Sequence, residues 1–228
     1  MWFVTSEQTA GRGRRQRPWI APRGNLAASV LETLDATPGV AATLGFAAGL
    51  ALEGALEEVA RGAANRMASE LKFRLKWPND VLAGREKLAG ILLEAEVVPD
   101  SRLAVVVGIG TNVVAAPEGM PAPATSLLKQ GLSTSAEQLF AALSESWVEF
   151  YEIWDQGRGF DEIRRLWLAK AAGLGLPLTV QTGGRTIEGT FDTIDDAGCM
   201  IVRASNGDRV PISAGDVYFG SAASAGAT

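Results

Sequence analysis

The sequence predicts an α+β protein in two parts, a large region that combines strands with helices and a small β-rich region that begins near Leu176. Two observations carry this prediction. The segment 37–62 is rich in alanine and opens with Thr-Pro, which is typical of a helix start because proline is tolerated in the first turn. After Leu176, short β-rich runs alternate at close spacing with turn pairs such as Gly-Gly and Asn-Gly, which is typical of a small barrel.

The spacing of apolar residues places the remaining elements. Aromatic and aliphatic residues recur at helical spacing up to residue 154, after Thr134 and Glu137, which form a capping-box signature. These aromatic residues are expected in the core, and a second helix with one apolar face is expected over 160–171. Strands are expected at 2–4, 26–34, 73–76, 81–83, 87–97 and 103–107, and in the small region at 178–180, 186–194, 200–202, 210–212 and 217–219. We expect domains at 1–172 and 175–220, and a tail at 221–228 without fixed structure.

The composition restricts the chemistry. The chain has 228 residues and contains no histidine, which excludes Ser–His and Cys–His mechanisms and the common zinc sites. Reactive groups must therefore come from Lys, Arg, Asp, Glu, backbone amides or a hard cation. The single cysteine, Cys199, excludes an internal disulfide and indicates a reducing compartment. It is expected to be a buried small residue and not a nucleophile.

Composition also bears on partners and location. We expect no apolar run long enough to span a membrane and no charged-then-apolar leader, and therefore a cytoplasmic protein without a membrane partner. The formal net charge of −5 argues against a nucleic-acid binder, because such proteins use broad positive surfaces.

The segment 8–19 is the most unusual stretch of the chain. It reads Gln-Thr-Ala-Gly-Arg-Gly-Arg-Arg-Gln-Arg-Pro-Trp, with four arginines in the six positions 12–17. Glycine allows close approach of a ligand to the backbone, and guanidinium groups suit phosphates and carboxylates. Alone, this segment is equally compatible with a solvated basic loop. Two more segments accompany it: Lys-Trp-Pro-Asn-Asp at 76–80 with Lys-Leu-Ala-Gly-Ile-Leu at 87–92, and Gly-Ile-Gly-Thr-Asn at 108–112.

In this order, the three segments resemble those of biotin protein ligases, enzymes that adenylate biotin and attach it to a lysine of a carrier domain. The resemblance covers the chain from about Val4 to Phe219. It implies a catalytic domain with a mixed β-sheet backed by helices, related to class II aminoacyl-tRNA synthetases and lipoate ligases, followed by an SH3-like barrel. It also implies ATP and biotin as substrates, Mg²⁺, a biotin carboxyl carrier domain as partner, and a monomer or a homodimer. Family members that act as repressors carry an N-terminal winged helix, which is not seen here, so a monofunctional ligase is expected.

The chemistry explains the residue types that the resemblance assigns. The carboxylate of biotin is ionised near neutral pH, so its attack on the α-phosphorus of ATP requires cations and positioning and no general base. The resemblance implies Lys87, Arg14 and Asp80 as catalytic residues, with Asp80 also a candidate ligand of Mg²⁺. It places Gln8, Arg12, Gly13, Arg14, Lys87 and Gly90 around biotin, and Arg14, Arg15, Trp19, Asn79, Gly110 and Asn112 around ATP or the adenylate.

Several alternatives stand beside these assignments. Lys87 is compatible with an ordinary edge-strand lysine, Trp77-Pro78 with a packed turn, and Asn112 with a strand-end cap. The chain as a whole is compatible with a lipoate or other carboxylate ligase of the same fold. It is also compatible with a truncated relative that binds biotin or a carrier domain without turnover, and a nucleic-acid binder is the least favoured alternative.

Two departures from the family pattern are visible. Family members carry a strand, a helix and a Ser/Thr-Thr-Asn segment ahead of the arginine loop, and here only Met1 precedes the strand that leads into the loop. We therefore expect a natural polypeptide that is longer by about 20–40 residues, enough for a strand–helix unit. The second departure is Gln16, where the loop usually has glycine; Gln16 is expected to avoid positive φ and to stiffen the loop.

Overall fold

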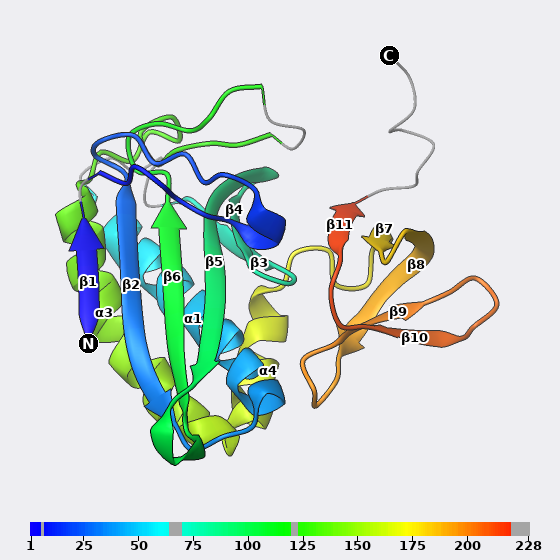
Figure 1. The fold of residues 1–228 in the computed structure, drawn as a ribbon. Coiled ribbons are helices and arrows are strands. Elements are labelled where there is room, and N and C mark those ends of the chain that lie inside the picture. The colour runs from blue at the N-terminus through cyan, green and yellow to red at the C-terminus, as the bar shows by residue number, and fades with distance from the viewer. Residues whose placement is uncertain (6, 64–69, 120–122, 220–228) are drawn as a thin grey trace.

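The computed structural model describes residues 1–5, 7–63, 70–119 and 123–219. A large sheet with helices packed on one face carries the N-terminal part of the chain, and a small sheet carries the C-terminal part (Figure 1). The predicted α+β class is confirmed. The predicted tail at 221–228 lies outside the described residues.

The large sheet has six strands in the order β1-β2-β6-β5-β4-β3, and every neighbouring pair is antiparallel. Parallel pairing in the described residues is limited to two single bridges, Leu75 with Ala171 and Lys87 with Ala124. The sheet is therefore mixed only through these bridges. Its strands are β1 (Trp2–Thr5), β2 (Leu26–Leu34), β3 (Phe73–Lys76), β4 (Asp80–Ala83), β5 (Glu86–Val97) and β6 (Leu103–Thr111).

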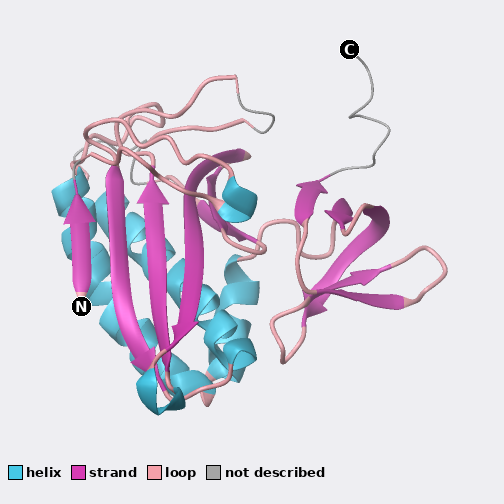
Figure 2. Ribbon diagram, in the orientation of Figure 1, coloured by secondary structure: helices cyan, strands magenta, loops and turns pink. Residues whose placement is uncertain are grey.

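The three α-helices of the described chain cover one face of the large sheet (Figure 2). On β6, Val105, Val107 and Ile109 are buried towards the helices, whereas the alternating residues are only partly buried. This alternation places the apolar residues against the helices and leaves the opposite face available for a site. The helices are α1 (Pro38–Arg61), α3 (Ala136–Trp154) and α4 (Phe160–Lys170).

The helix starts are set by side-chain caps. Thr37 caps α1, where its hydroxyl accepts a hydrogen bond from the Val40 amide at 3.4 Å. For α3 the predicted cap is one residue early: Ser135 accepts from the Gln138 amide, and the Gln138 side chain accepts from the Ser135 amide. The capping box thus uses Ser135 and Gln138 in place of Thr134 and Glu137, because the first turn of the helix begins at Ala136.

Helix α1 corrects one expectation from the sequence. By length and composition, Pro38–Arg61 is apolar enough to cross a membrane, although no such run was expected. In the structure, 72% of its most apolar window is buried inside the protein. Its apolar surface is covered by the large sheet on one side and by α3 and α4 on the other, which is the environment of a core helix.

The C-terminal sheet has five antiparallel strands in the order β10-β9-β8-β7-β11. Within the described residues its outer strands, β10 and β11, do not pair, so this SH3-like unit is not closed into a barrel by hydrogen bonds. Cys199 is half-buried, less than expected, and burial followed by the nearby Asp195 raises the pKa of its thiol. The strands are β7 (Pro177–Thr182), β8 (Arg185–Ile194), β9 (Met200–Arg203), β10 (Arg209–Ile212) and β11 (Asp216–Phe219).

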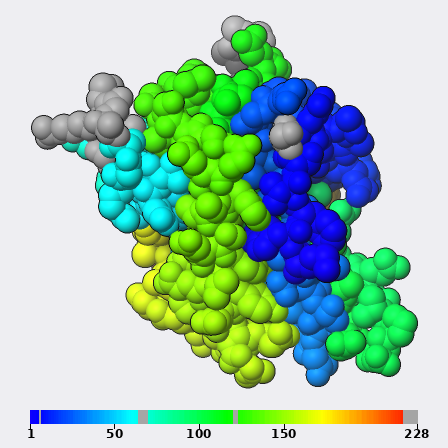
Figure 3. Space-filling model, turned by 90° about the vertical axis from the view of Figure 1, so that its left-hand side faces the viewer, coloured from blue at the N-terminus to red at the C-terminus, as the bar shows by residue number. Residues whose placement is uncertain are grey.

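Strand β1 forms the outer edge of the large sheet. It lies at the surface beside α3 (Figure 3), and Trp2 packs edge-on against Phe140 and Trp147 of that helix, with ring centroids 5.3 and 5.7 Å away. Phe3 and Val4 are 56% and 48% exposed. The expectation of a longer natural polypeptide stays a prediction.

Candidate active site

The open face of the large sheet has a floor of small residues. Strand register places Ala27 opposite Gly110, Gly110 opposite Gly90, and Gly90 opposite Asp80, so these residues form one row across four strands on the same face. The indole of Trp19 lies on the two glycines. A Cβ atom at Gly110 would lie only 2.5 Å from Trp19 Nε1, and one at Gly90 would lie 3.3 Å from Trp19 Cζ3. The position of Trp19 therefore requires glycine at residue 110, and at residue 90 it leaves barely enough space for a Cβ atom.

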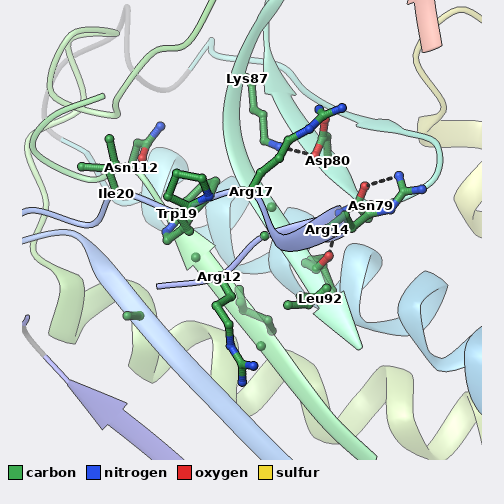
Figure 4. A pocket seen from close by; sticks show the side chains of 18 of the residues that line it. Arg12, Arg14, Arg17, Trp19, Ile20, Asn79, Asp80, Lys87, Leu92 and Asn112 are labelled. Atoms are coloured by element: carbon green, nitrogen blue, oxygen red, sulfur yellow. Dashed lines mark hydrogen bonds and ion pairs between the residues drawn. The ribbon is translucent and has the colours of Figure 1, made fainter. Parts of the chain in front are cut away.

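A cavity of about 410 Å³ lies over this floor. The arginine loop, the β3–β4 turn and residues 215–218 of the C-terminal sheet bound it, and Figure 4 shows side chains of the loop, the turn and β5 around one space. Arg15 is the one predicted residue outside the lining. The predicted residues that line the cavity are Gln8, Arg12, Gly13, Arg14, Trp19, Asn79, Asp80, Lys87, Gly90, Gly110 and Asn112.

The arginine loop contains a tight turn over Arg14–Gln16. The Gly13 amide donates to the Arg17 carbonyl at 2.7 Å, and the Arg17 amide donates to the Arg14 carbonyl at 3.2 Å. Arg15 and Gln16 have φ of 56° and 60°. The prediction that Gln16 avoids positive φ is therefore wrong: the closed turn requires left-handed backbone at these two residues, at a cost on the order of 1 kcal/mol each.

Three arginines of the loop are held by carboxylates. Arg15 Nη1 and Arg17 Nη2 each lie 2.8 Å from Asp216 Oδ2 at the start of β11, and Arg12 Nη2 lies 3.4 Å from Glu94 Oε2 on β5. Burial acts to raise the pKa of Asp216, but Arg17, Arg15 and Arg14 outweigh it, so this pKa is lowered. The C-terminal sheet thus fixes one side of the loop.

Arg14 is the half-buried arginine of the loop. Its Nη1 donates to Asn79 Oδ1 at 3.2 Å and to the Gly215 carbonyl at 3.3 Å, and the Asn79 amide in turn donates to the Ile91 carbonyl at 2.7 Å (Figure 4). Burial lowers the pKa of Arg14, opposed by Asp216. Arginine remains protonated despite this lowering of its pKa. Because both hydrogen-bond acceptors of Arg14 are neutral, its positive charge is available to an anion in the cavity.

Lys87 points from the start of β5 into the cavity, towards Asp80 (Figure 4). Its Nζ lies 2.5 Å from Asp80 Oδ1 and 5.6 Å from the centroid of the Trp19 ring. Although this ion pair is close, Asp80 Oδ1 is buried and accepts no hydrogen bond of acceptable geometry. These contacts disfavour the alternative of an ordinary edge-strand lysine.

Asp80 has the properties of a single carboxylate ligand for Mg²⁺. Its Oδ1 is buried, accepts no hydrogen bond from the described residues and faces Lys87, and Mg²⁺ is usually held by one or two carboxylates together with substrate phosphates. Across the described residues, no cluster of three or more Asp, Glu, His or Cys side chains is suited to a metal ion. Asp80 therefore fits a metal that arrives with a nucleotide and does not fit a permanent protein-only site.

Asn112 has a structural role as well as a place in the lining. It is 1% exposed, and its side-chain amide donates to the Thr125 carbonyl at 3.1 Å. Its Oδ1 faces Asn25 Nδ2 at 3.5 Å. The alternative of a strand-end cap is therefore correct for part of this side chain. Asn25, which the sequence did not single out, organises the same loop, because its Oδ1 accepts from the Val113 and Val114 amides at 3.0 Å each.

The Trp77-Pro78 turn has both a structural role and a role in shaping the cavity. Trp77 is 2% exposed, and its indole donates to the Gly198 carbonyl at 3.1 Å, which ties the turn to the C-terminal sheet. The packed-turn alternative is thus correct for the body of Trp77. The turn, which contains a cis Trp77-Pro78 peptide bond, nevertheless carries Asn79 and Asp80 into the cavity.

Lys76, Ser29 and Asp216 are among the cavity-lining residues that the sequence did not single out. Lys76 had a local signal, because it opens the segment 76–80. Ser29 and Asp216 had none, since strand register alone places Ser29 opposite Gly108, and Asp216 approaches the loop from about 200 residues away in the sequence.

Comparisons with known proteins agree with this geometry. Residues 2–112 match the model of the biotin/lipoate A/B protein ligase family, and residues 173–220 match that of the biotin protein ligase C-terminal domain. The chain is 39% identical over 225 residues to the biotin–[acetyl-CoA-carboxylase] ligase of Paracoccus denitrificans, covering 96% of this chain and 90% of that protein. It is 35% identical to the enzyme of that name from Mycobacterium tuberculosis, covering 94% and 77%.

Solved structures show the same fold. The biotin protein ligase of Aquifex aeolicus in complex with biotin and ATP superposes with a TM-score of 0.77 at 24% identity, covering 96% of this chain and 89% of that one. The Leishmania major enzyme in complex with biotinyl-5-AMP gives a TM-score of 0.60 at 25% identity, covering 93% and 88%. With both domain models matched and relatives aligned over nearly their full length, the chain belongs to the biotin protein ligase family.

Proposed function

We propose that the protein is an ATP-dependent biotin–protein ligase, which activates biotin to biotinyl-5′-AMP and transfers biotin to a lysine of a biotin carboxyl carrier domain. The observation that carries this proposal is the meeting of Arg14, Lys87 and Asp80 beside a glycine floor covered by Trp19. Relatives named biotin–[acetyl-CoA-carboxylase] ligases, which the chain matches over almost its whole length, support the same activity.

The residues divide into an apolar end and a cationic end of the cavity. Gly90 and Gly110 let the Trp19 indole lie close to the sheet, and the indole supplies an aromatic surface on which the adenine base can stack. Gln8 and Arg12 also line the cavity, and we assign them to biotin. In this assignment the reacting groups meet next to Lys87 and Arg14.

The adenylation step follows from the charges. An oxygen of the biotin carboxylate attacks the α-phosphorus of ATP, the bond from that phosphorus to the bridging oxygen breaks, and pyrophosphate leaves with the electron pair. Both reactants are anions, so their approach is opposed until cations offset the repulsion. Arg14 and Lys87 supply that charge at fixed positions. No histidine is needed, because no proton is transferred in this step.

Asp80 has two tasks in this scheme. It orients Lys87 through the ion pair with its Oδ1, and its carboxylate would help to hold a Mg²⁺ ion that enters with the nucleotide. The metal supplies further charge neutralisation on the phosphates. In the second step, the ε-amine of the acceptor lysine attacks the carbonyl of the adenylate, and AMP leaves.

The partner is a carrier domain of a biotin-dependent carboxylase, consistent with the names of the relatives. We extend the proposal to a monomer or homodimer that acts in the cytoplasm without a nucleic-acid or membrane partner. The single cysteine and the burial of α1 support this location.

The test is ATP–pyrophosphate exchange with purified protein, with biotin, with lipoate and with neither. Exchange that depends on biotin supports the ligase, exchange that depends on lipoate supports a lipoate ligase, and no exchange in any arm supports a non-catalytic relative. Transfer is then followed as streptavidin-detected labelling of a carrier domain, with its acceptor lysine replaced by arginine as the control.

A further inference from the structure

Lys76 lines the cavity, but the proposed adenylation mechanism gives it no role. It is the last residue of β3, and register places it opposite Asp80, which in turn lies opposite Gly90. Residues opposite one another share a face, so the row that forms the floor continues to Lys76. With strands about 4.8 Å apart, Lys76 lies roughly 10 Å from Gly90, at the cationic end of the cavity. Its side chain belongs to the lining.

Like Arg14, Lys76 forms no ion pair with the residues that the structure describes, but unlike Arg14 it also lacks a hydrogen bond there. Lys87 has Asp80, and Arg15 and Arg17 have Asp216, whereas no ion pair or hydrogen bond of the Lys76 ammonium occurs among the residues that the structure describes. Its Nζ instead lies 5.7 Å from the centroid of the Phe219 ring on β11.

The surroundings of Lys76 favour the arrival of an anion. The side chain is half-buried, and burial lowers the pKa of its ammonium, opposed by Asp80. Lys87 adds a second positive charge nearby and lowers the pKa further. Asp80 and Asp216 favour the charged form of Lys76 but do not outweigh burial, and an anion bound between Lys76 and Lys87 would offset the remaining cost.

We propose that Lys76 binds the pyrophosphate part of the nucleotide, so that it holds the β- and γ-phosphates of ATP and stabilises pyrophosphate as it leaves. The proposal rests on the proposed adenylation. Lys87 and Arg14 then act on the α-phosphorus, while Lys76 takes the charge of the electron pair that moves onto the bridging oxygen when its bond to the α-phosphorus breaks. Phe219 holds the lysine stem in place from the C-terminal sheet.

A purely structural role is the competing explanation, because the Lys76 ammonium lies over the Phe219 ring, 5.7 Å from its centroid. Lys76→Met separates the two, since methionine keeps an unbranched apolar stem against the ring and loses the charge. Lys76→Arg restores a cation. Lys72→Met is the matched control, because Lys72 is an exposed lysine that leads into the same strand and lies outside the cavity lining.

The experiment measures the Kd of inorganic pyrophosphate on the full-length protein by calorimetry, and the KM values for ATP and biotin in the exchange reaction. For Lys76→Met we expect pyrophosphate Kd and KM for ATP to rise about tenfold, the lower end for a lost charged hydrogen bond, with the Kd of biotin unchanged. Lys76→Arg should recover most of the loss, and Lys72→Met should match the unchanged protein.

Equal pyrophosphate affinity in the unchanged protein and Lys76→Met overturns the proposal. A parallel loss of biotin affinity, or a lowered melting temperature that Lys76→Arg does not correct, also overturns it in favour of a structural role. If the unchanged protein shows no biotin-dependent exchange, the proposed function fails, and the pyrophosphate comparison still decides the role of Lys76.

Discussion

Gly110→Ala tests whether the glycine floor positions Trp19. An added Cβ would lie 2.5 Å from Nε1, 2.6 Å from Cε2 and 2.8 Å from Cζ2 of the Trp19 indole, all shorter than contacts that folded proteins accept. Trp19 lies on a loop and is only partly buried, so it can move more easily than the strand that carries Gly110. We therefore expect the indole to shift by about 1 Å or more while the strand stays in place.

The magnitude follows from what the indole does for a nucleotide. If Trp19 stacks on the adenine base, loss of that stacking costs about 1–3 kcal/mol, so the KM for ATP should rise about 5- to 100-fold. Folding stability should not fall, because alanine is favoured over glycine inside a strand by about 0.5–1 kcal/mol. The variant is therefore expected to be as stable as the unchanged protein and poor in adenylation.

The assay is the KM for ATP in ATP–pyrophosphate exchange, with the melting temperature measured in parallel. Gly108→Ala is the matched control for the strand, two residues earlier on the same face. Its Cβ would meet the Leu92 carbonyl oxygen at 3.5 Å and would not contact Trp19, so its KM for ATP should change far less. A normal KM for ATP in Gly110→Ala would refute the reasoning, as would a large loss of stability.

Three further predictions concern charge. Lys87→Ala should raise the barrier to biotinyl-adenylate formation by about 2.7–4 kcal/mol without unfolding the protein, measured as single-turnover pyrophosphate release; near-normal release would remove Lys87 from the mechanism. Asp216→Asn should free the loop 12–17, because two partly exposed ion pairs contribute about 1 kcal/mol together, so trypsin should cut this loop about fivefold faster. We also expect biotin with ATP to order the loop and suppress cutting, because the bound anions offset the repulsion among its arginines; equal rates with and without ligands would contradict this. Burial raises the pKa of Glu53 to about 7, so the native state retains a proton that the unfolded chain releases, and the resulting stabilisation is lost as pH rises through 7. Denaturant unfolding should then show Glu53→Gln gaining about 1–3 kcal/mol relative to the unchanged protein between pH 5 and pH 8, whereas parallel curves would mean that Glu53 is ionised throughout.

Local features were predictable because they depend on neighbours in the chain. Thr37 and Pro38 start α1 as expected, since capping and the first-turn preference for proline act within a few residues. Loose alternation of apolar residues likewise located β2, and a run of Val and Leu located the first part of β6, which continues beyond the predicted end at 107 to Thr111. The same locality limits precision: the choice between Thr134 and Ser135 as the cap depends on which residue begins the helix, and both carry a hydroxyl.

The sequence by itself determined the kind of chemistry, through the absence of histidine and the three segments that contain the arginines, Lys87 and Asp80. Only the tertiary structure decided which cations are already paired. Asp216 reaches Arg15 and Arg17 because β11 packs against the loop, and Asp80 pairs with Lys87 although register places it opposite Lys76. Such contacts depend on how strands from distant parts of the chain align, and a one-residue change in register would turn each side chain to the other face of the sheet.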